Sequence, residues 1–115
     1  MDLDKSFVSG SIPLLVMKLL EDGDLYGYQM IEELRRRSDD TFHLKAGTLY
    51  PLLHGLEEKG FVTAYEQAAA NGKSRRYYHL TDQGHVALRE KEASWKTYAR
   101  AVGQVLKGGA CCAGA

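Results

Sequence analysis

Cysteine is scarce in this chain. Only two of the 115 residues are cysteines, and they are adjacent, Cys111-Cys112, in a Gly/Ala-rich segment. Adjacent cysteines close a disulfide ring only with strain, and no third or fourth ligand lies near them in the sequence to complete a zinc site. We therefore expect no cofactor and no metal site, and a disordered tail over residues 108–115. The alternative is that this weak candidate pair senses a soft metal or an oxidant through its thiols.

Long apolar runs are also missing. No stretch approaches the roughly 20 apolar residues that a membrane-spanning helix needs. The start, Met1-Asp-Leu-Asp4, is acidic and does not resemble a secretory signal. The hydrophobic and charged fractions, 44% and 26%, are ordinary for a globular domain. These absences predict a cytoplasmic protein of one domain with no membrane partner.

Enzyme motifs are absent from the sequence. The four histidines, at positions 43, 54, 79 and 85, fall on separate predicted elements. No nucleophile motif, phosphate-binding loop or metal-ligand spacing surrounds them. The sequence therefore predicts a protein that is not an enzyme.

The chain lacks net charge, but its charges are unevenly distributed. Residues 1–34 carry two basic and seven acidic side chains, a net charge of −5. Residues 35–80 carry eight basic and five acidic side chains, a net charge of +3. Residues 81–115 carry five basic and three acidic ones, a net charge of +2. A locally positive middle segment is what a nucleic acid would meet, so DNA is not excluded as a partner.

Residues 45–60 predict the helix around which the chain is organised. Its apolar residues recur at helical spacing: Leu49, Leu52, Leu53 and Leu56. Gly60 can take the left-handed conformation of a C-terminal cap. The opposite face carries hydrogen-bond donors suited to a DNA major groove: Lys45, Thr48, Tyr50 and His54. The alternative is a solvated face on a core helix, and Pro51 leaves open whether the helix starts near Ala46 or Thr48.

Two helices are predicted before it. Residues 7–20 are apolar almost all round, with Ser9 or Ser11 as the cap, and a partner subunit is expected to cover part of this helix. Residues 25–37 form the second, with its inward stripe at Tyr28, Ile31 and Leu34. Its last turn, residues 35–37, is all arginine, which suits the helix dipole or reaches a DNA backbone. Residues 42–44 are expected to form a minimal strand.

A β-hairpin follows, with strands at residues 61–67 and 74–80. Asn71-Gly72 in the link is a strong turn signal. The tip presents three cations: Lys73, Arg75 and Arg76. They either discourage edge-to-edge aggregation or contact DNA. The order helix, helix, strand, helix, basic hairpin predicts a winged helix-turn-helix, a mainly α fold with a small hairpin.

Thr81 is expected to cap a long final helix over residues 82–106. Leu88, Trp95 and Val102 lie seven residues apart, and Tyr98 and Val105 continue a second series that Lys91 interrupts. A dimer would cover this seam together with the first helix. The expected interface comprises Ile12, Leu15, Leu19, Leu88, Trp95, Tyr98, Val102 and Val105. The predicted division is a DNA-binding domain over 1–80, a dimerisation helix over 81–107 and a tail over 108–115.

Three segments resemble the PadR family of bacterial transcriptional regulators: Tyr26-Gly-Tyr28, the run from Gly47-Thr-Leu-Tyr-Pro-Leu-Leu-His54 to Leu56-Glu-Glu-Lys-Gly60, and Arg75-Arg-Tyr-Tyr-His-Leu-Thr81 before Gly84. The match covers residues 8–84, and the lone C-terminal helix resembles the short PadR-like subgroup. The Cys111-Cys112 tail is outside the family pattern.

The resemblance implies a homodimeric winged helix-turn-helix repressor of inverted-repeat operators, released by a small aromatic or hydrophobic effector. It places an effector at the dimer centre, near Trp95, Leu88 and Tyr98, although Trp95 could equally be a dimer-core aromatic. It also suggests that Tyr28 lies near DNA, whereas periodicity places Tyr28 in the core. The alternatives are a repressor that responds through Cys111 and Cys112, a repressor with no effector at all, and a winged-helix module that binds protein.

Overall fold

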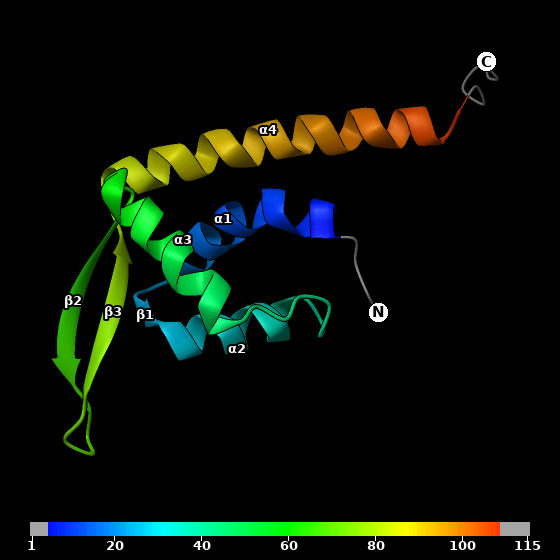
Figure 1. Ribbon diagram of the computed structural model, residues 1–115. Helices are drawn as coiled ribbons and strands as arrows, with labels where there is room; N and C mark the ends of the chain where they lie inside the picture. Colours follow the sequence, from blue (N-terminus) through cyan, green and yellow to red (C-terminus); the bar gives the residue numbers. More distant parts are fainter. Residues whose placement is uncertain (1–4, 109–115) are drawn as a thin grey trace.

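The computed structural model describes residues 5–108 and has the predicted winged helix-turn-helix fold with a long C-terminal helix (Figure 1). Its elements follow in the order α1 (Lys5–Glu21), β1 (Leu25–Tyr26), α2 (Gly27–Arg37), α3 (Ala46–Glu58), β2 (Val62–Ala68), β3 (Ser74–Leu80) and α4 (Asp82–Leu106). None of the helices within 5–108 combines the length and apolarity needed to cross a membrane. The predicted tail with Cys111 and Cys112 lies outside the described residues.

The sheet has three antiparallel strands in the order β1-β3-β2. The wing formed by β2 and β3 agrees with the predicted hairpin, and Gly72 in its turn has a φ of +83°. The predicted strand at residues 42–44 is wrong. The backbone N–H of Phe42 donates to the Ser38 hydroxyl at 2.9 Å, so it needs no strand partner. The third strand is instead β1, whose Leu25 and Tyr26 pair with Tyr78 and Tyr77.

The core lies between α1, α2, α3, the start of α4 and the inner face of the sheet. The predicted stripe of α3 is confirmed, since Leu49, Leu53 and Leu56 are buried and Leu52 is partly buried. In α2, the prediction that Tyr28 points inward is wrong, because its side chain is 63% exposed. The helix starts at Gly27, and the i, i+3, i+7 series that faces the core is Gly27, Met30 and Leu34.

The first helix is covered largely by its own chain. It starts at Lys5, before both predicted caps, and Pro13 lies inside it. Ile12 and Leu19 are buried, and α4 packs along α1 on the side away from α2 (Figure 1). The prediction that Ile12 and Leu19 form a subunit interface is therefore corrected, because neither has appreciable surface left to give to a partner. Leu15 is only partly buried.

The start of α4 is tied to the end of α3. Gly60 ends α3 with a φ of +81°, as predicted for a C-terminal cap. The Thr81 hydroxyl donates to the carbonyls of Gly60 and Phe61, at 2.7 and 3.1 Å, and accepts from the Gly84 N–H at 3.0 Å. A Cβ on Gly84 would lie 2.1 Å from the Phe61 carbonyl oxygen, so only glycine fits this approach. The joint therefore fixes where α4 leaves the winged domain.

Candidate nucleic-acid interface

The exposed side of α3 carries the four polar residues expected to face DNA. Lys45 is the N-cap, and Thr48, Tyr50 and His54 follow on the side opposite the buried leucines. The helix begins at Ala46, so Pro51 lies beyond its first turn and removes one backbone donor without ending the helix. The His54 ring lies 3.5 Å from the Glu58 carboxylate. Lys45 and Thr48 supply hydrogen-bond donors on the N-terminal half of this face.

The Tyr50 side chain is partly exposed and also packs against α2. Its hydroxyl would lie 2.2 Å from a Cβ built on Gly27, so the ring packs across the first residue of α2. Any larger residue at position 27 would push Tyr50 away. Gly27 and Tyr50 thus set how closely the two helices of the helix-turn-helix approach each other. Tyr28, the next residue along, is exposed beside this contact.

The two wing arginines lie on opposite faces of the sheet, because successive side chains of a strand alternate. The Arg76 guanidinium lies on the face toward α3, 3.6 Å from both the Glu57 and the Glu66 carboxylates. The same guanidinium lies 3.3 Å from the Tyr78 hydroxyl. Arg76 is therefore occupied by contacts within its own chain.

Arg75 lies on the outer face of the wing. Its guanidinium donates to the Tyr26 hydroxyl at 2.5 Å and lies 4.5 Å from the centre of the Tyr26 ring. Lys73, at the turn, differs from both arginines because its ammonium has no ion pair within residues 5–108. Of the three predicted wing cations, only Lys73 has no side-chain partner in the part of the chain that the structure describes.

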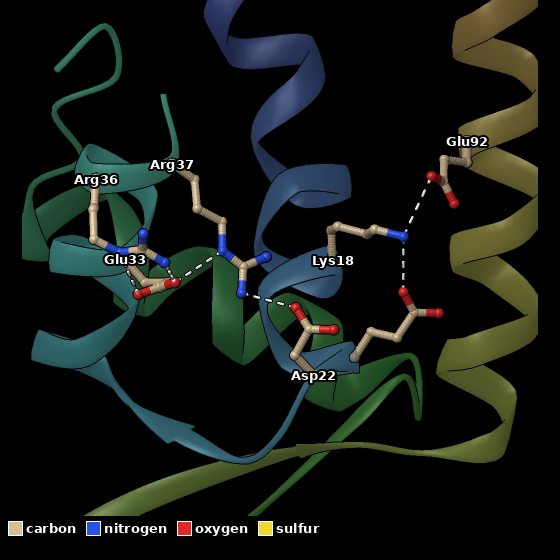
Figure 2. A network of polar contacts seen from close by, with 7 residues as sticks. Lys18, Asp22, Glu33, Arg36, Arg37 and Glu92 are labelled. Carbon is tan, nitrogen blue, oxygen red and sulfur yellow. Dashed lines mark hydrogen bonds and ion pairs between the residues drawn. The ribbon is translucent and has the colours of Figure 1, made fainter. Parts of the chain in front are cut away.

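The arginines that end α2 are paired with acids. Figure 2 shows Arg36 and Arg37 converging on Glu33, and Arg37 also reaching Asp22 at 2.8 Å. Hydrogen bonds from Arg36 and then Arg37 lower the pKa of Glu33 to about 2, from 4.5. Arg35 pairs with Glu32 and Asp40 at 2.9 and 3.3 Å. These ion pairs favour the helix-end interpretation of the arginine run over a DNA contact.

Asp24 joins the turn before β1 to the outer face of the wing. Its carboxylate accepts from the Tyr65 hydroxyl at 2.7 Å and lies 2.8 Å from Nδ1 of His79. Partial burial acts to raise the pKa of Asp24, but the hydrogen bonds from His79 and Tyr65 outweigh it, and the pKa is lowered. Sequence analysis missed this group, because only the pairing of three strands brings its members together.

A groove of about 710 Å³ runs between α1 and α4. Its lining includes Trp95 and Tyr98, which are 49% and 69% exposed, and Pro13, Phe61 and Ala87. Leu88 does not line it. That residue is fully buried against the core of its own chain, so its predicted roles in effector binding and in the dimer interface are both corrected. Among residues 5–108, no cluster of three metal-ligating side chains occurs.

Known proteins resemble this chain over most of its length. Residues 16–90 match the family described as "Transcriptional regulator PadR-like family". The transcriptional regulator Rv3488 of Mycobacterium tuberculosis is 32% identical over 98 residues, which are 85% of this chain and 88% of that protein. An uncharacterised protein of Lysinibacillus sphaericus is 31% identical over 88 residues, 76% of this chain and 81% of its own length.

Solved structures agree with this similarity. A PadR family transcriptional regulator from Eggerthella lenta is 32% identical, with a TM-score of 0.79, over 90% of this chain and 88% of that chain. A PadR family transcription regulator from Clostridium difficile is also 32% identical, with a TM-score of 0.74, over 84% of this chain and 98% of that chain. The exposed donor face of α3, the wing and these matches lead to one conclusion: this chain belongs to the PadR-like family of transcriptional regulators, and it is a DNA-binding protein rather than an enzyme.

Proposed function

We propose that the protein is a homodimeric repressor of inverted-repeat operators. In this proposal α3 enters the major groove and the wing follows the adjacent backbone. The observation that carries it is the division of α3 into a buried leucine stripe and an exposed face that bears Lys45, Thr48, Tyr50 and His54. Lys73 at the wing tip supplies a further cation for a phosphate.

The proposed DNA contacts are of two kinds, those to base edges and those to the phosphate backbone. Thr48 and His54 face base edges, and Lys45 and Lys73 face phosphates, which supply most of the salt-dependent affinity. Tyr28 and Tyr50 are exposed beside them, at the start of α2 and on α3, and in this proposal Tyr28 donates to the DNA backbone while Tyr50 packs against Gly27 at the edge of the interface. Arg76 is half-exposed, and its contact with a phosphate would compete with its ion pairs to Glu57 and Glu66.

The second half of α4 is the proposed dimer interface. Tyr98, Val102 and Val105 are 69%, 37% and 77% exposed in the isolated chain, and Trp95 lies on the same half of the helix. Such an apolar surface is unfavourable in water and calls for a partner. In Figure 1 the end of α4 runs past the rest of the described chain, which leaves that end open to a second copy. A two-fold dimer would place its recognition helices about 34 Å apart on one face of the DNA.

The proposed effector site is the groove that Trp95 and Tyr98 line. A flat aromatic compound would stack on the exposed indole. Release from DNA requires that the compound bind one arrangement of the two recognition helices better than the other. Phe61 lines the groove and also accepts a hydrogen bond from Thr81, so a ligand there would touch the segment that follows α3.

The proposed DNA contacts are tested by measuring how DNA binding depends on salt concentration. The wild-type protein selects its operator from a random-sequence duplex library, and the operator affinity is then measured against salt concentration. Lys45→Ala and Lys73→Ala should each reduce the slope of log K against log[salt] by about one unit. Lys96→Ala on α4 removes the same charge away from the proposed DNA face and is the matched control. Equal losses in all three variants would mean that only net charge matters.

Fluorescence of Trp95, the only tryptophan, tests the effector site. Planar aromatic compounds are titrated into the protein with and without operator DNA. Quenching that bound operator weakens supports a ligand-released repressor. Absence of quenching by every compound, with DNA binding intact, would leave Trp95 as a packing residue of the dimer.

A further inference from the structure

We propose that Tyr26 and Arg75 form a clamp that fixes the wing against the start of α2. In this view Arg75 is a positioning residue, which affects operator binding through the place of the wing rather than through its own phosphate contact. The inference rests on the proposed DNA-binding mode and deepens it. It changes the role that the sequence suggested for Arg75.

The first argument is the occupancy of the Arg75 guanidinium. Its Nη1 donates to the Tyr26 hydroxyl at 2.5 Å, and its plane lies over the Tyr26 ring at 4.5 Å from the ring centre. A hydrogen bond and a cation–π contact to one ring orient the guanidinium strongly. Lys73, two residues earlier, has no comparable partner within residues 5–108. A phosphate could therefore bind the Lys73 ammonium directly, whereas the Arg75 guanidinium is already in contact with Tyr26.

The second argument is the position of Tyr26. It is the N-cap of α2, and its backbone N–H donates to the Gln29 side chain at 3.1 Å, which ties it to the first turn of that helix. The next residue, Gly27, is the one across which Tyr50 of α3 packs. Arg75 on β3 is thus connected to the recognition helix through Tyr26, the last residue of β1, and Gly27, the first residue of α2. A shift of the Arg75 contact would move the wing relative to α3.

The third argument is that the outer face of the wing continues the clamp. The Tyr77 ring meets Tyr26 edge-on at 5.4 Å between ring centres and stacks on Tyr65 at 5.7 Å. Tyr65 in turn donates to Asp24, just before β1. One row of rings therefore spans all three strands and ends at both sides on the segment that leads into α2. Such a row resists bending of the hairpin at its base.

The test separates positioning from contact by using variants that keep charge. Tyr26→Phe removes only the hydroxyl, and Arg75→Lys keeps the cation but loses the planar guanidinium. Both should weaken operator binding about fivefold to tenfold without changing the salt slope, because no phosphate contact is lost. The double variant should lose no more than either single variant, since both break the same contact. Arg75→Met should show the same loss with the same slope.

The matched control is Tyr77→Phe, which stays in the same row of rings but whose hydroxyl has no hydrogen-bond partner within residues 5–108. It should bind the operator like the wild type. Thermal unfolding without DNA adds a second readout, in which Tyr26→Phe and Arg75→Lys should be coupled. That coupling can be measured even if the wild type selects no operator, which would refute the proposed function separately.

Two results would overturn the clamp. In the first, Arg75→Lys binds like the wild type while Arg75→Met loses about one unit of salt slope, which is the signature of a direct phosphate contact. In the second, Tyr26→Phe and Arg75→Lys have additive effects or none on operator binding and on unfolding. Rescue by lysine and independence from Tyr26 both contradict a positioning role.

Discussion

The two halves of α4 have different surroundings although they belong to one regular helix. In the first half, Gly84, Ala87 and Leu88 are buried against the winged domain. In the second half, Trp95, Tyr98, Val102 and Val105 are exposed. The seven-residue spacing from Leu88 to Trp95 to Val102 crosses this division without change. Regular spacing therefore identifies a helix face but does not tell what covers that face.

The structure gives the reason for the difference. The first half starts at the Thr81 joint and lies along α1, which covers it within the same chain. The end of α4 extends beyond α1 (Figure 1), and the exposed Trp95 and Tyr98 line the groove between the two helices. We therefore assign the first half to the stability of the subunit and the second to the proposed dimer. Four predictions test that division.

The largest effect is expected for Leu88→Ala. This side chain is fully buried, so truncation leaves a cavity and should lower the free energy of unfolding by about 2–5 kcal/mol. Urea unfolding at several protein concentrations measures it, because a dimer has concentration-dependent stability. Val86→Ala, on the exposed side of the same turn, should change stability by less than about 0.5 kcal/mol. Equal losses for the two variants would remove the basis for calling the first half core.

Val105→Asp should act on assembly instead. A carboxylate in an apolar interface is left without partners, which should weaken dimerisation by about 1–3 kcal/mol or more. Sedimentation equilibrium should show monomers at concentrations where the wild type is a dimer, with an unchanged circular dichroism spectrum. Lys107→Asp, close by in sequence but outside the apolar series, serves as the control. A Val105→Asp protein that remains fully dimeric would contradict the proposed interface.

Thr81→Ala tests the joint from which both halves extend. It removes the cap of α4 and the hydrogen bonds to Gly60 and Phe61, and should cost about 1 kcal/mol of stability. Thr81→Ser keeps the hydroxyl and should recover most of the loss in the same thermal unfolding measurement. If serine does not recover it, the contribution of Thr81 comes from its methyl group rather than from capping.

Glu92→Gln should have the smallest effect. Lys18 lies 2.8 Å from Glu21 and 3.5 Å from Glu92, and Figure 2 shows its ammonium reaching toward Glu92. Such exposed pairs contribute at most about 1 kcal/mol and often nothing. We expect no measurable change in melting temperature. A large loss would mean that ion pairs, rather than apolar contacts, hold the first half of α4 to α1.

The same network gives a pH dependence with a definite sign. The hydrogen bond from Lys18 lowers the pKa of Glu21 below 4.5, and that with Glu21 raises the pKa of Lys18 above 10.5. The stabilisation is thus present between these values. It is lost as pH falls through the lowered pKa of Glu21 or rises through the raised pKa of Lys18. Glu21→Gln should remove the acid-side loss, whereas Glu92→Gln should leave it.

Local signals predicted most of the fold. Thr81 marked the start of α4, Asn71-Gly72 marked the wing turn, and Gly60 marked the end of α3. Each of these residues determines the backbone conformation of the few residues next to it in the sequence, so its effect can be predicted from the sequence. The strand β1 was missed because two residues form a strand only when β3 lies beside them. The prediction that Tyr28 faces the core was wrong because the side of α2 that faces the core depends on where the helix starts, and that point is set by the end of β1.

The sequence predicted which residues of the candidate site are exposed better than it predicted which of its cations have partners within the chain. The exposed face of α3 was foreseen from helical period alone. The contact between Glu66 and Arg76 was also within reach, since the hairpin register places them directly opposite each other. The contacts of Arg76 with Glu57, and of Arg75 with Tyr26, join residues far apart in the chain. Counting cations in the sequence therefore overstated how many lack a side-chain partner within the described part of the chain.

Arg76 shows what such internal pairing means for a protein that searches a genome. The carboxylates of Glu57 and Glu66 each lie 3.6 Å from its guanidinium. In the proposed binding mode, a phosphate that contacts Arg76 would compete with these carboxylates. Random sequence, which offers only a loosely placed backbone, gains little from the exchange. A well-fitted operator holds its phosphates in place and gains more. Glu57 and Glu66 would thereby shorten the time spent on wrong sites, which favours discrimination over raw affinity.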